Sequence, residues 1–320
     1  MKSKTILSSS LKVLITGGSG MVGMNLIECA PEHIKLLAPS SNELNLLSKA
    51  CIKDYLLKES PDLIIHAAGI VGGIRANINY PVRFLSANTE MANNLFGIAA
   101  ELEVTYLLNL GSSCMYPVKG ENPLKEELIL TDYLEPTNEG YAIAKIFAQR
   151  LCAYINHEKG NKNYKTLIPC NLYGKYDKFD SEWGHMIPAV IKKIHEAKSE
   201  QRDTVEIWGD GEARREFMLA EDLARYIWQL VDNIDSVPEL MNVGLGFDYS
   251  INDYYQKIAK VVGYEGDFTH DLSKPVGMKR KVVDIFRMKS VLPLTSTSLE
   301  EGLKNTFDYY MTKYNMHEKD

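Results

Sequence analysis

LKVLITGGSGMVG, residues 11–23, is the stretch that decides the fold of this chain. Its first six residues read as a buried parallel strand, which is typically a continuous apolar run. The glycines that follow allow a tight turn, and the pattern from Met24 to Cys29 predicts a helix. A strand, a glycine-rich turn and a helix in this order predict a dinucleotide site, because N–H groups at the helix N-terminus can bind a pyrophosphate. A glycine triplet by itself could be an ordinary loop.

The composition is that of an ordinary soluble globular protein. The 320 residues are 45% hydrophobic and 24% charged, which suits one large or two medium domains. The net charge of -6 argues against general binding to nucleic acid or a membrane surface. The first ten residues lack the apolar core of a signal peptide, and no apolar run is long enough to cross a bilayer. The five cysteines have no metal-ligand spacing, so we expect no metal, reduced thiols and a cytoplasmic location.

More buried strands and helices are expected along the chain. The strands comprise residues 34–38, 61–69, 105–110, 166–169 and 240–243, and helical patterns cover residues 81–100, 141–156 and 221–231. This alternation predicts an α/β fold, a Rossmann-type doubly wound parallel sheet. Residues 72–79 and 170–174 are expected to be loops. The chain becomes less regular after residue 175, with a strand at 205–208 and mostly helix after 250.

Two domains that interleave in the sequence are expected. Residues 10–175 and 216–247 form a dinucleotide-binding domain. Residues 176–215 and 248–320 form a smaller, mixed α/β substrate domain. We expect the substrate to bind in the cleft between them.

The dinucleotide is expected beyond the carboxyl ends of the strands. After the second strand an acidic residue would bind the ribose of NAD and repel a 2′-phosphate, but Ser40 and Ser41 stand there. Their hydroxyls can bond a phosphate, which favours NADPH over NADH. The alternative is a plain turn before a helix at Glu43. The predicted cofactor-binding residues are Gly17, Gly20, Met21, Val22, Gly23, Ser40, Ser41, Ala67, Ala68, Gly69, Leu110, Tyr141 and Lys145.

Tyr141 and Lys145 are four residues apart in a segment with a helical pattern, so their side chains share one face. A phenol normally loses its proton near pH ~10, too high for acid/base work at neutral pH. A nearby ammonium should lower the pKa of Tyr141 and make it a usable proton donor. The alternative is an amphipathic helix with a surface lysine.

Ser112, Ser113 and Cys114 directly follow the strand at residues 105–110. Ligands of open α/β sheets bind beyond the carboxyl ends of the strands, so these side chains are expected at the mouth of the site. An ordinary polar turn is the alternative, since serine favours turns for local reasons.

Several strings together resemble the extended short-chain dehydrogenase/reductases and, more narrowly, the GDP-L-fucose synthase family of GDP-4-keto-6-deoxy-mannose epimerase-reductases. Besides the glycine-rich turn, HAAG at 66–69 and the Tyr141/Lys145 pair, the matching strings include VGGI at 71–74, NLYG at 171–174 and RREF at 214–217. Residues 110–117, 134–139 and Trp208-Gly209 also match, so the resemblance covers nearly the whole chain.

The resemblance implies roles for individual residues. Tyr141 and Lys145 correspond to the reductase pair, and Ser112 or Ser113 would donate a hydrogen bond to the keto oxygen. Cys114 and His185 stand where the family has its epimerisation acid/base pair. The GDP half of a GDP-linked keto-sugar would contact segments containing Asn171, Lys193, Trp208, Arg215, Arg280 and Lys281. The resemblance also implies a homodimer through the helices at 87–100 and 141–156.

The chain departs from the family at three places. Gly140 stands where the family has proline, Met218-Leu219-Ala220 replaces Leu-His-Val, and serines 19, 40 and 41 stand where bacterial members carry arginines. The expected activity is NADPH-dependent reduction of carbon 4 of a GDP-4-keto-6-deoxy sugar, after 3,5-epimerisation if the Cys114/His185 pair is active. One alternative is a plain carbon-4 reductase of a GDP-4-keto-heptose. A redox-sensing regulator or a nucleotide-sugar dehydratase would share the fold, but the first lacks the Tyr-Lys pair and the second needs acidic residues where Ser113-Cys114 stand.

Overall fold

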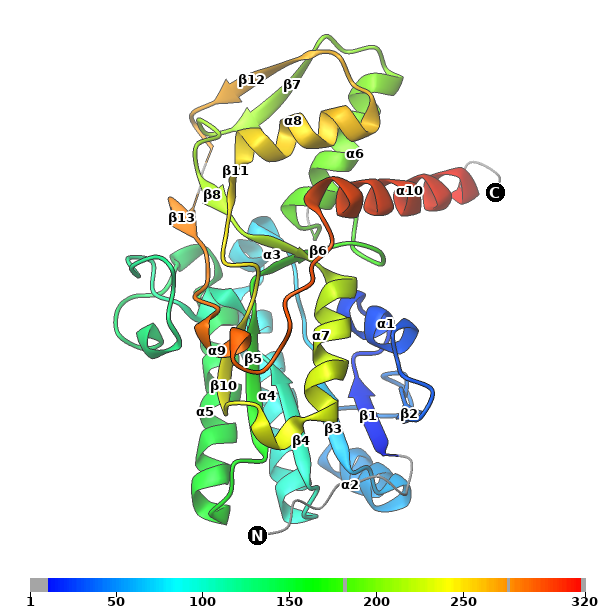
Figure 1. The fold of residues 1–320 in the computed structure, drawn as a ribbon, viewed down its shortest axis with the longest axis vertical. Coiled ribbons are helices and arrows are strands. Elements are labelled where there is room, and N and C mark those ends of the chain that lie inside the picture. The colour runs from blue at the N-terminus through cyan, green and yellow to red at the C-terminus, as the bar shows by residue number, and fades with distance from the viewer. Residues whose placement is uncertain (1–10, 181–182, 275–276, 318–320) are drawn as a thin grey trace.

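The computed structural model describes residues 11–180, 183–274 and 277–317. Figure 1 shows a parallel sheet flanked by helices and, above it in this view, a smaller group of elements around β7, β12, α6 and α8. The expected α/β class, with a parallel sheet and a smaller mixed part, is confirmed.

The main sheet has six parallel strands in the order β10-β5-β4-β3-β1-β2. All six predicted strands are confirmed, with small differences at their ends. The order reverses at β1, which lies between β2 and β3, and ligands of open α/β sheets bind at such a switch point. The strands are β1 (Lys12–Thr16), β2 (Lys35–Leu37), β3 (Leu63–His66), β4 (Tyr106–Leu110), β5 (Tyr164–Pro169) and β10 (Leu240–Val243).

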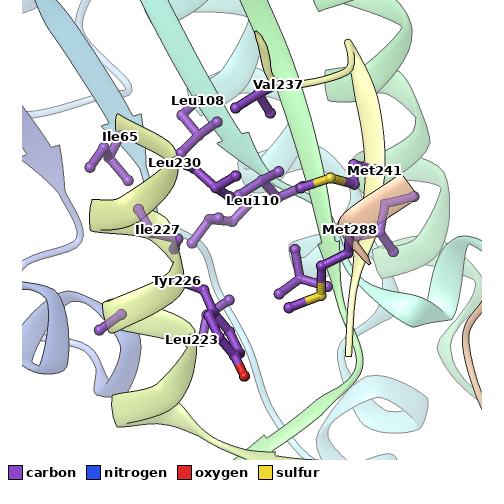
Figure 2. Packing of buried hydrophobic residues seen from close by; sticks show 14 of the residues in the cluster. Ile65, Leu108, Leu110, Leu223, Tyr226, Ile227, Leu230, Val237, Met241 and Met288 are labelled. Carbon is purple, nitrogen blue, oxygen red and sulfur yellow. The ribbon is translucent and has the colours of Figure 1, made fainter. Parts of the chain in front are cut away.

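Helices cover both faces of this sheet, because successive side chains of a strand point to opposite faces. Val13 and Ile15 belong to the core beneath α1 (Met21–Glu28) and α7 (Ala220–Asp232). Leu14 belongs to the core on the other face, beneath α2 (Lys49–Glu59), α4 (Pro81–Glu101) and α5 (Glu139–Lys159). Figure 2 shows the first core, where Leu223, Ile227 and Leu230 of α7 point toward Ile65, Leu108 and Leu110.

The turn after β1 depends on two glycines. Gly17 has a positive φ of 76°, and a Cβ built there would lie 2.6 Å from the backbone of Ala68. A Cβ at position 23 would lie 2.1 Å from the carbonyl oxygen of Gly17. Any larger residue would push α1 or the end of β3 away, so these glycines set how closely strand, turn and helix approach one another.

Four sequence-based expectations about elements are wrong. Residues 72–79 contain the helix α3 (Ile74–Asn79), with Gly73 as its N-cap. The helix expected at Glu43 begins only at Lys49, where the Ser48 side chain caps α2. The expected loop at 170–174 contains β6 (Asn171–Tyr173), which pairs with β9 (Phe217–Leu219). The less regular part after residue 175 contains α6 (Met186–Ser199).

The smaller group combines short strands with three long helices. β7 (Thr204–Trp208) pairs with β12 (Asp267–Asp271), and β8 (Arg214–Arg215) lies between β11 (Tyr249–Ser250) and β13 (Arg280–Lys281). α6 packs with α8 (Ile251–Val262) and α10 (Leu299–His317) around their own apolar core. The remaining short helices are α9 (Phe286–Lys289) and the 3₁₀ turns η1 (Ser113–Met115), η2 (Glu126–Leu128), η3 (Pro136–Asn138) and η4 (Ile234–Ser236).

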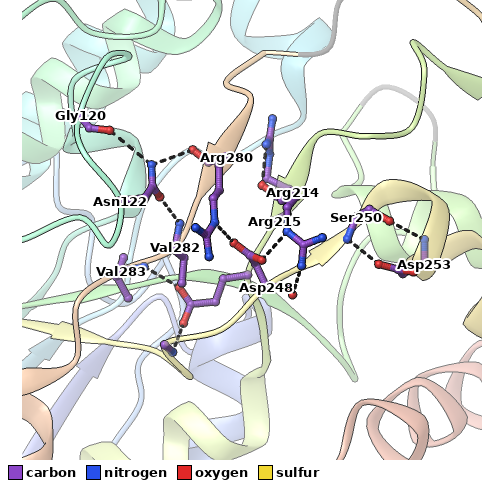
Figure 3. A network of polar contacts seen from close by, with 12 residues as sticks. Gly120, Asn122, Arg214, Arg215, Asp248, Ser250, Asp253, Arg280, Val282 and Val283 are labelled. Carbon is purple, nitrogen blue, oxygen red and sulfur yellow. Dashed lines mark hydrogen bonds and ion pairs between the residues drawn. The ribbon is translucent and has the colours of Figure 1, made fainter.

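A polar network fastens β8, β11 and β13 to one another (Figure 3). The carboxylate of Asp248 accepts hydrogen bonds from Arg214 Nε at 2.7 Å and from Arg280 Nε at 2.5 Å. The side chain of Asn122 accepts from the Val282 N–H at 2.9 Å and donates to the Arg280 carbonyl oxygen at 3.3 Å. These bonds hold β13, and with it Lys281, against the chain segments that follow β4 and β10.

Candidate active site

A cavity of about 860 Å³ lies beyond the carboxyl ends of β1, β3, β4 and β5. It is bounded by the turn before α1, the start of α5, the loop between β6 and α6, and β13. The predicted residues that line it are Gly20, Met21, Val22, Gly23, Ala67, Gly69, Leu110, Ser112, Ser113, Cys114, Tyr141, Lys145, Asn171, His185 and Lys281. The predicted residues outside the lining are Gly17, Ser40, Ser41, Ala68, Lys193, Trp208, Arg215 and Arg280.

One end of the cavity fits a dinucleotide pyrophosphate. Gly20 caps α1 without a side-chain hydrogen bond, and residues 20–23 line the cavity. The N–H groups of a first helical turn have no partner inside the helix and carry the positive end of its dipole. The glycine turn thus presents donors to an anion without a side chain in the way.

The loop after β2 brings the acidic side chain of Glu43 back onto Ser40, a contact that the sequence did not predict. The carboxylate of Glu43 turns back and accepts hydrogen bonds from the Ser40 N–H and hydroxyl, both at 2.8 Å. The backbone and side-chain hydrogen bonds of Ser40 lower the pKa of Glu43. Ser40 is therefore engaged inside its own loop.

Tyr141 and Lys145 share one face of α5, as expected, but their ionisation differs from the expectation. The Lys145 ammonium donates to the Leu110 carbonyl oxygen at 2.8 Å and lies 5.6 Å from the centre of the Tyr141 ring. Burial raises the pKa of Tyr141, and Cys114 raises it further. Burial also lowers the pKa of Lys145 to about 8. The prediction that Lys145 lowers the phenol pKa is wrong for this geometry, because burial penalises both charged forms.

Gly140 explains how the start of α5 reaches this position. A Cβ at residue 140 would lie 2.9 Å from the Pro81 carbonyl oxygen and 3.6 Å from Leu85 Cβ. The absence of a side chain allows α5 to approach the start of α4. The ring of Phe84 then packs edge-on against Tyr141, with centres 6.1 Å apart.

Ser112, Ser113 and Cys114 follow the end of β4 and line the cavity. Ser112 caps η1 and accepts a hydrogen bond from the Cys114 N–H at 3.3 Å. Cys114 is buried, and burial raises its pKa, while Lys281 and, to a smaller extent, Lys145 oppose that rise. Partial burial of Lys281 lowers its pKa. The positive charges of Lys281 and Lys145 thus favour the thiolate form of Cys114.

His185 also lines the cavity, as the N-cap residue of α6. Its Nδ1 is 3.1 and 3.2 Å from the two carboxylate oxygens of Asp177. Burial lowers the pKa of His185, but the charge and hydrogen bond of Asp177 outweigh this effect and raise it. Asp177 was missed in the sequence because nothing in its loop shows that it folds onto residue 185.

The residues expected to bind the GDP half are spread over different environments. Asn171 lines the cavity while its side chain donates to the Glu216 carbonyl oxygen at 2.9 Å. Arg280 is engaged with Asp248 at 2.5 Å, and Lys193 donates to the Glu206 carbonyl oxygen at 2.5 Å. The Arg75 guanidinium lies 5.0 Å above the Trp208 ring. Burial lowers the pKa of Arg215.

The cavity also has acceptors and an aromatic wall that the sequence did not reveal. Asn77 and Asn138 both line it, and each has a buried side-chain oxygen without a hydrogen-bond partner in the described part of the chain. Such oxygens suit a ligand with hydroxyl donors. The Trp183 ring is stacked on Tyr80 and Phe84 at centre distances of 5.9 and 6.3 Å.

The described residues contain neither a metal-binding cluster nor a membrane-spanning helix. No group of three or more His, Cys, Asp or Glu side chains could hold a metal ion among residues 11–180, 183–274 and 277–317. Over the same ranges, no helix is long and apolar enough to cross a membrane.

Comparisons with known proteins agree with this geometry. A family described as "NAD dependent epimerase/dehydratase family" matches residues 13–244. The chain is 52% identical to a GDP-L-colitose synthase of Yersinia pseudotuberculosis, over 95% of this chain and 99% of that protein. It is 46% identical to a GDP-L-fucose synthase of Azorhizobium caulinodans, over 96% and 98%. A solved GDP-mannoheptose C4 reductase from Campylobacter jejuni with NADP bound superposes with a TM-score of 0.85 and 29% identity, over 95% and 99%.

The electrostatic contact between Lys281 and Cys114 leads to a prediction. In Lys281→Met the pKa of the thiol should rise, because a cation that stabilises the thiolate is removed. At pH 8, iodoacetamide should alkylate Cys114 about tenfold more slowly than in the wild-type protein, for a shift of about one unit. Mass spectrometry of the Cys114 peptide measures this rate. Lys279→Met, which alters an exposed lysine two residues away, should leave it unchanged, and equal rates in both variants would refute the contact.

Proposed function

We propose that this chain, which belongs to the NAD dependent epimerase/dehydratase family, uses NADPH to reduce carbon 4 of a GDP-4-keto-6-deoxy sugar. It is a GDP-4-keto-sugar epimerase/reductase of the GDP-L-fucose and GDP-L-colitose synthase type. We also propose that one or both of the neighbouring carbons, 3 and 5, are epimerised first. The supporting observation is that one cavity is lined by Tyr141, Cys114 and His185 next to the glycine turn.

The chemistry follows from the ketone. A carbonyl at carbon 4 acidifies the C–H bonds at carbons 3 and 5, because loss of either proton gives an enolate. Hydrogen bonds from the hydroxyls of Tyr141 and Ser112 or Ser113 would stabilise the enolate oxygen. Epimerisation must precede reduction, since a reduced carbon 4 no longer acidifies its neighbours.

Cys114 and His185 are proposed as the epimerisation pair. Cys114 would take the proton from one face as a thiolate, a state that the adjacent Lys281 stabilises. His185, whose pKa is raised by Asp177, would return a proton to the other face. The two residues reach the same cavity from different elements, η1 and the N-terminus of α6.

Tyr141 is proposed as the proton donor of the reduction. NADPH, when bound, supplies the hydride to carbon 4. The half-buried phenol of Tyr141 stays protonated near neutral pH because desolvation raises its pKa, so a proton is available for the developing alkoxide. The Lys145 ammonium is held next to Tyr141 by its hydrogen bond to the Leu110 carbonyl oxygen.

The remaining assignments are also proposals. Residues 10–175 and 216–247 would bind the dinucleotide, and residues 176–215 and 248–320 the nucleotide sugar. Asn171 and Lys281 are the predicted GDP-half residues that line the cavity. A ligand that extends beyond the cavity would contact the other four predicted residues, Lys193, Trp208, Arg215 and Arg280.

A homodimer through α4 and α5 is proposed as well. These helices pack on each other, and they leave Val82, Leu85, Ile143 and Tyr154 exposed on the molecular surface. A symmetric pair of such faces would remove these apolar side chains from water. Light scattering at micromolar concentration measures the mass, and a monomer would contradict the proposal.

The reductase assignment predicts the behaviour of Tyr141→Phe. Wild-type protein should oxidise NADPH when given GDP-4-keto-6-deoxy-mannose. The variant should be slower by about 10² to 10⁴, the usual contribution of an acid/base group, while its affinity for NADPH stays near that of the wild type. Absorbance at the NADPH band follows the reaction. Tyr133→Phe, at an exposed position, is the control, and undiminished turnover in Tyr141→Phe would contradict the proposed role.

Epimerisation can be separated from reduction in D₂O. Wild-type protein incubated with the keto-sugar, but without reductant, should incorporate deuterium at carbon 3 or carbon 5, and NMR detects this. The competing function is a plain carbon-4 reductase of a GDP-4-keto-heptose type sugar, which the fold shared with a heptose reductase favours. No incorporation with intact NADPH oxidation would select that reductase.

The cofactor preference is a separate prediction. Ser40 and Ser41 are exposed and carry hydroxyls that can bond a 2′-phosphate, and the related heptose reductase is solved with NADP bound. The nearby Glu43 carboxylate, which is held by Ser40, works against a phosphate. We expect NADPH to bind more tightly than NADH, and Glu43→Gln to widen the difference. Fluorescence titration with both cofactors tests this, and tighter binding of NADH would overturn it.

A further inference from the structure

The carboxylate of Asp177 is fixed inside the loop that joins β6 to α6. Its side chain is only 4% exposed. Oδ1 accepts a hydrogen bond from the Lys178 N–H at 2.8 Å, and the Asp177 N–H donates to the Gly174 carbonyl oxygen at 3.4 Å. The position of this carboxylate is thus determined before any ligand is considered.

Both oxygens of that carboxylate face the same atom, Nδ1 of His185, at 3.1 and 3.2 Å. An ionised carboxylate can only accept hydrogen bonds, so Nδ1 must carry the proton of this contact. Nε2 is then the ring nitrogen that gains or loses a proton. No hydrogen bond to Nε2 is made by the residues that the structure describes, and His185 lines the cavity.

We propose that Asp177 is a positioning residue that holds the His185 imidazole by Nδ1 and keeps an acidic N–H at Nε2 turned toward the sugar. The inference rests on the proposed function, because it gives His185 the role of the acid that protonates the enolate carbon. The proton moves from Nε2 to that carbon, and the neutral imidazole that remains is again held by its Nδ1–H.

Without Asp177, the surroundings of His185 would keep its imidazole neutral. The side chain is only about one-third exposed, Lys178 lies nearby, and the positive end of the α6 dipole begins at this residue. Each of these opposes a second ring proton, and only the charge and hydrogen bond of Asp177 raise the His185 pKa. The other charged or titratable groups that line the cavity are Arg83, Cys114, Tyr141, Lys145, Tyr176, Asp180 and Lys281.

A purely structural ion pair would behave differently from a positioning residue. If Asp177 served only to fasten the loop, its loss would lower epimerisation and reduction together and would not change their pH dependence. A positioning residue should instead move the high-pH limb of the epimerisation profile, where His185 loses its proton, and leave hydride transfer much less affected. The two roles therefore differ in an observable other than activity.

The test is an NMR titration of histidine-labelled protein carrying Asp177→Asn. Asparagine retains an oxygen for the Lys178 N–H but removes the charge. The His185 resonance, assigned with His185→Gln, should titrate about one to three units lower than in wild type, the usual effect of losing an adjacent opposite charge. Asp177→Glu should restore much of the shift. Asp54→Asn, a loss of the same charge at an exposed position on α2, is the matched control.

The same variants are then compared in the D₂O exchange reaction. Exchange declines above the pKa of His185, so in Asp177→Asn this decline should begin at a lower pH, by the same shift as in the titration. NADPH oxidation should change less. An unchanged His185 titration, or equal losses of both activities without a shift, overturns the inference. Should Asp177→Asn not fold, the wild-type protein decides, because a neutral His185 with its proton on Nε2 and not on Nδ1 would also overturn it.

The outcome separates this inference from the proposed function. Absence of exchange in the wild-type protein, together with the expected titration shift in Asp177→Asn, would remove the epimerase proposal and leave the hold of Asp177 on His185. Exchange in the wild type without any shift in the variant would do the reverse.

Discussion

The buried carboxylate of Glu216 is the contact on which the cavity depends. It accepts hydrogen bonds from the N–H groups of Leu245, Gly246 and Val283 at 2.5, 2.8 and 2.8 Å, and burial raises its pKa to about 7. These groups belong to the loop after β10 and to the segment after β13. The carbonyl oxygen of the same residue holds Asn171 at the cavity. The side chain of this residue thus joins the loop after β10 to the segment after β13, and its backbone carbonyl holds Asn171.

Burial decides the protonation states in this cavity. It raises the pKa of Tyr141 and Cys114 and lowers that of Lys145 to about 8, so the site favours neutral groups. The exception is His185, where one ionised neighbour, Asp177, is close enough to reverse the effect of burial. A site with a protonated phenol, a protonated imidazole and a thiol facing Lys281 is suited to moving protons around a ketone.

Residues that are close in sequence were predictable. Periodicity and glycine sterics predict the strand, turn and helix from Lys12 to Glu28. They also predict the Tyr141/Lys145 pair on one face of α5 and the placement of Ser112 to Cys114 after β4. The helix α3, the strand β6 and the helix α6 were not predicted. β6, for example, is a strand because it pairs with β9, which is more than 40 residues away in the chain.

The sequence by itself determined the α/β class, the family and the chemical types at the site, because these depend on local patterns and on strings of neighbouring residues. Only the tertiary structure decided which residues meet. It brings Asp177 to His185 and Lys281 to Cys114, engages Ser40 with Glu43, and ties Arg280 to Asp248 away from the cavity lining. The physical reason is that burial and through-space charge, which set the pKa values, depend on distances between chain segments and not on their separation in sequence.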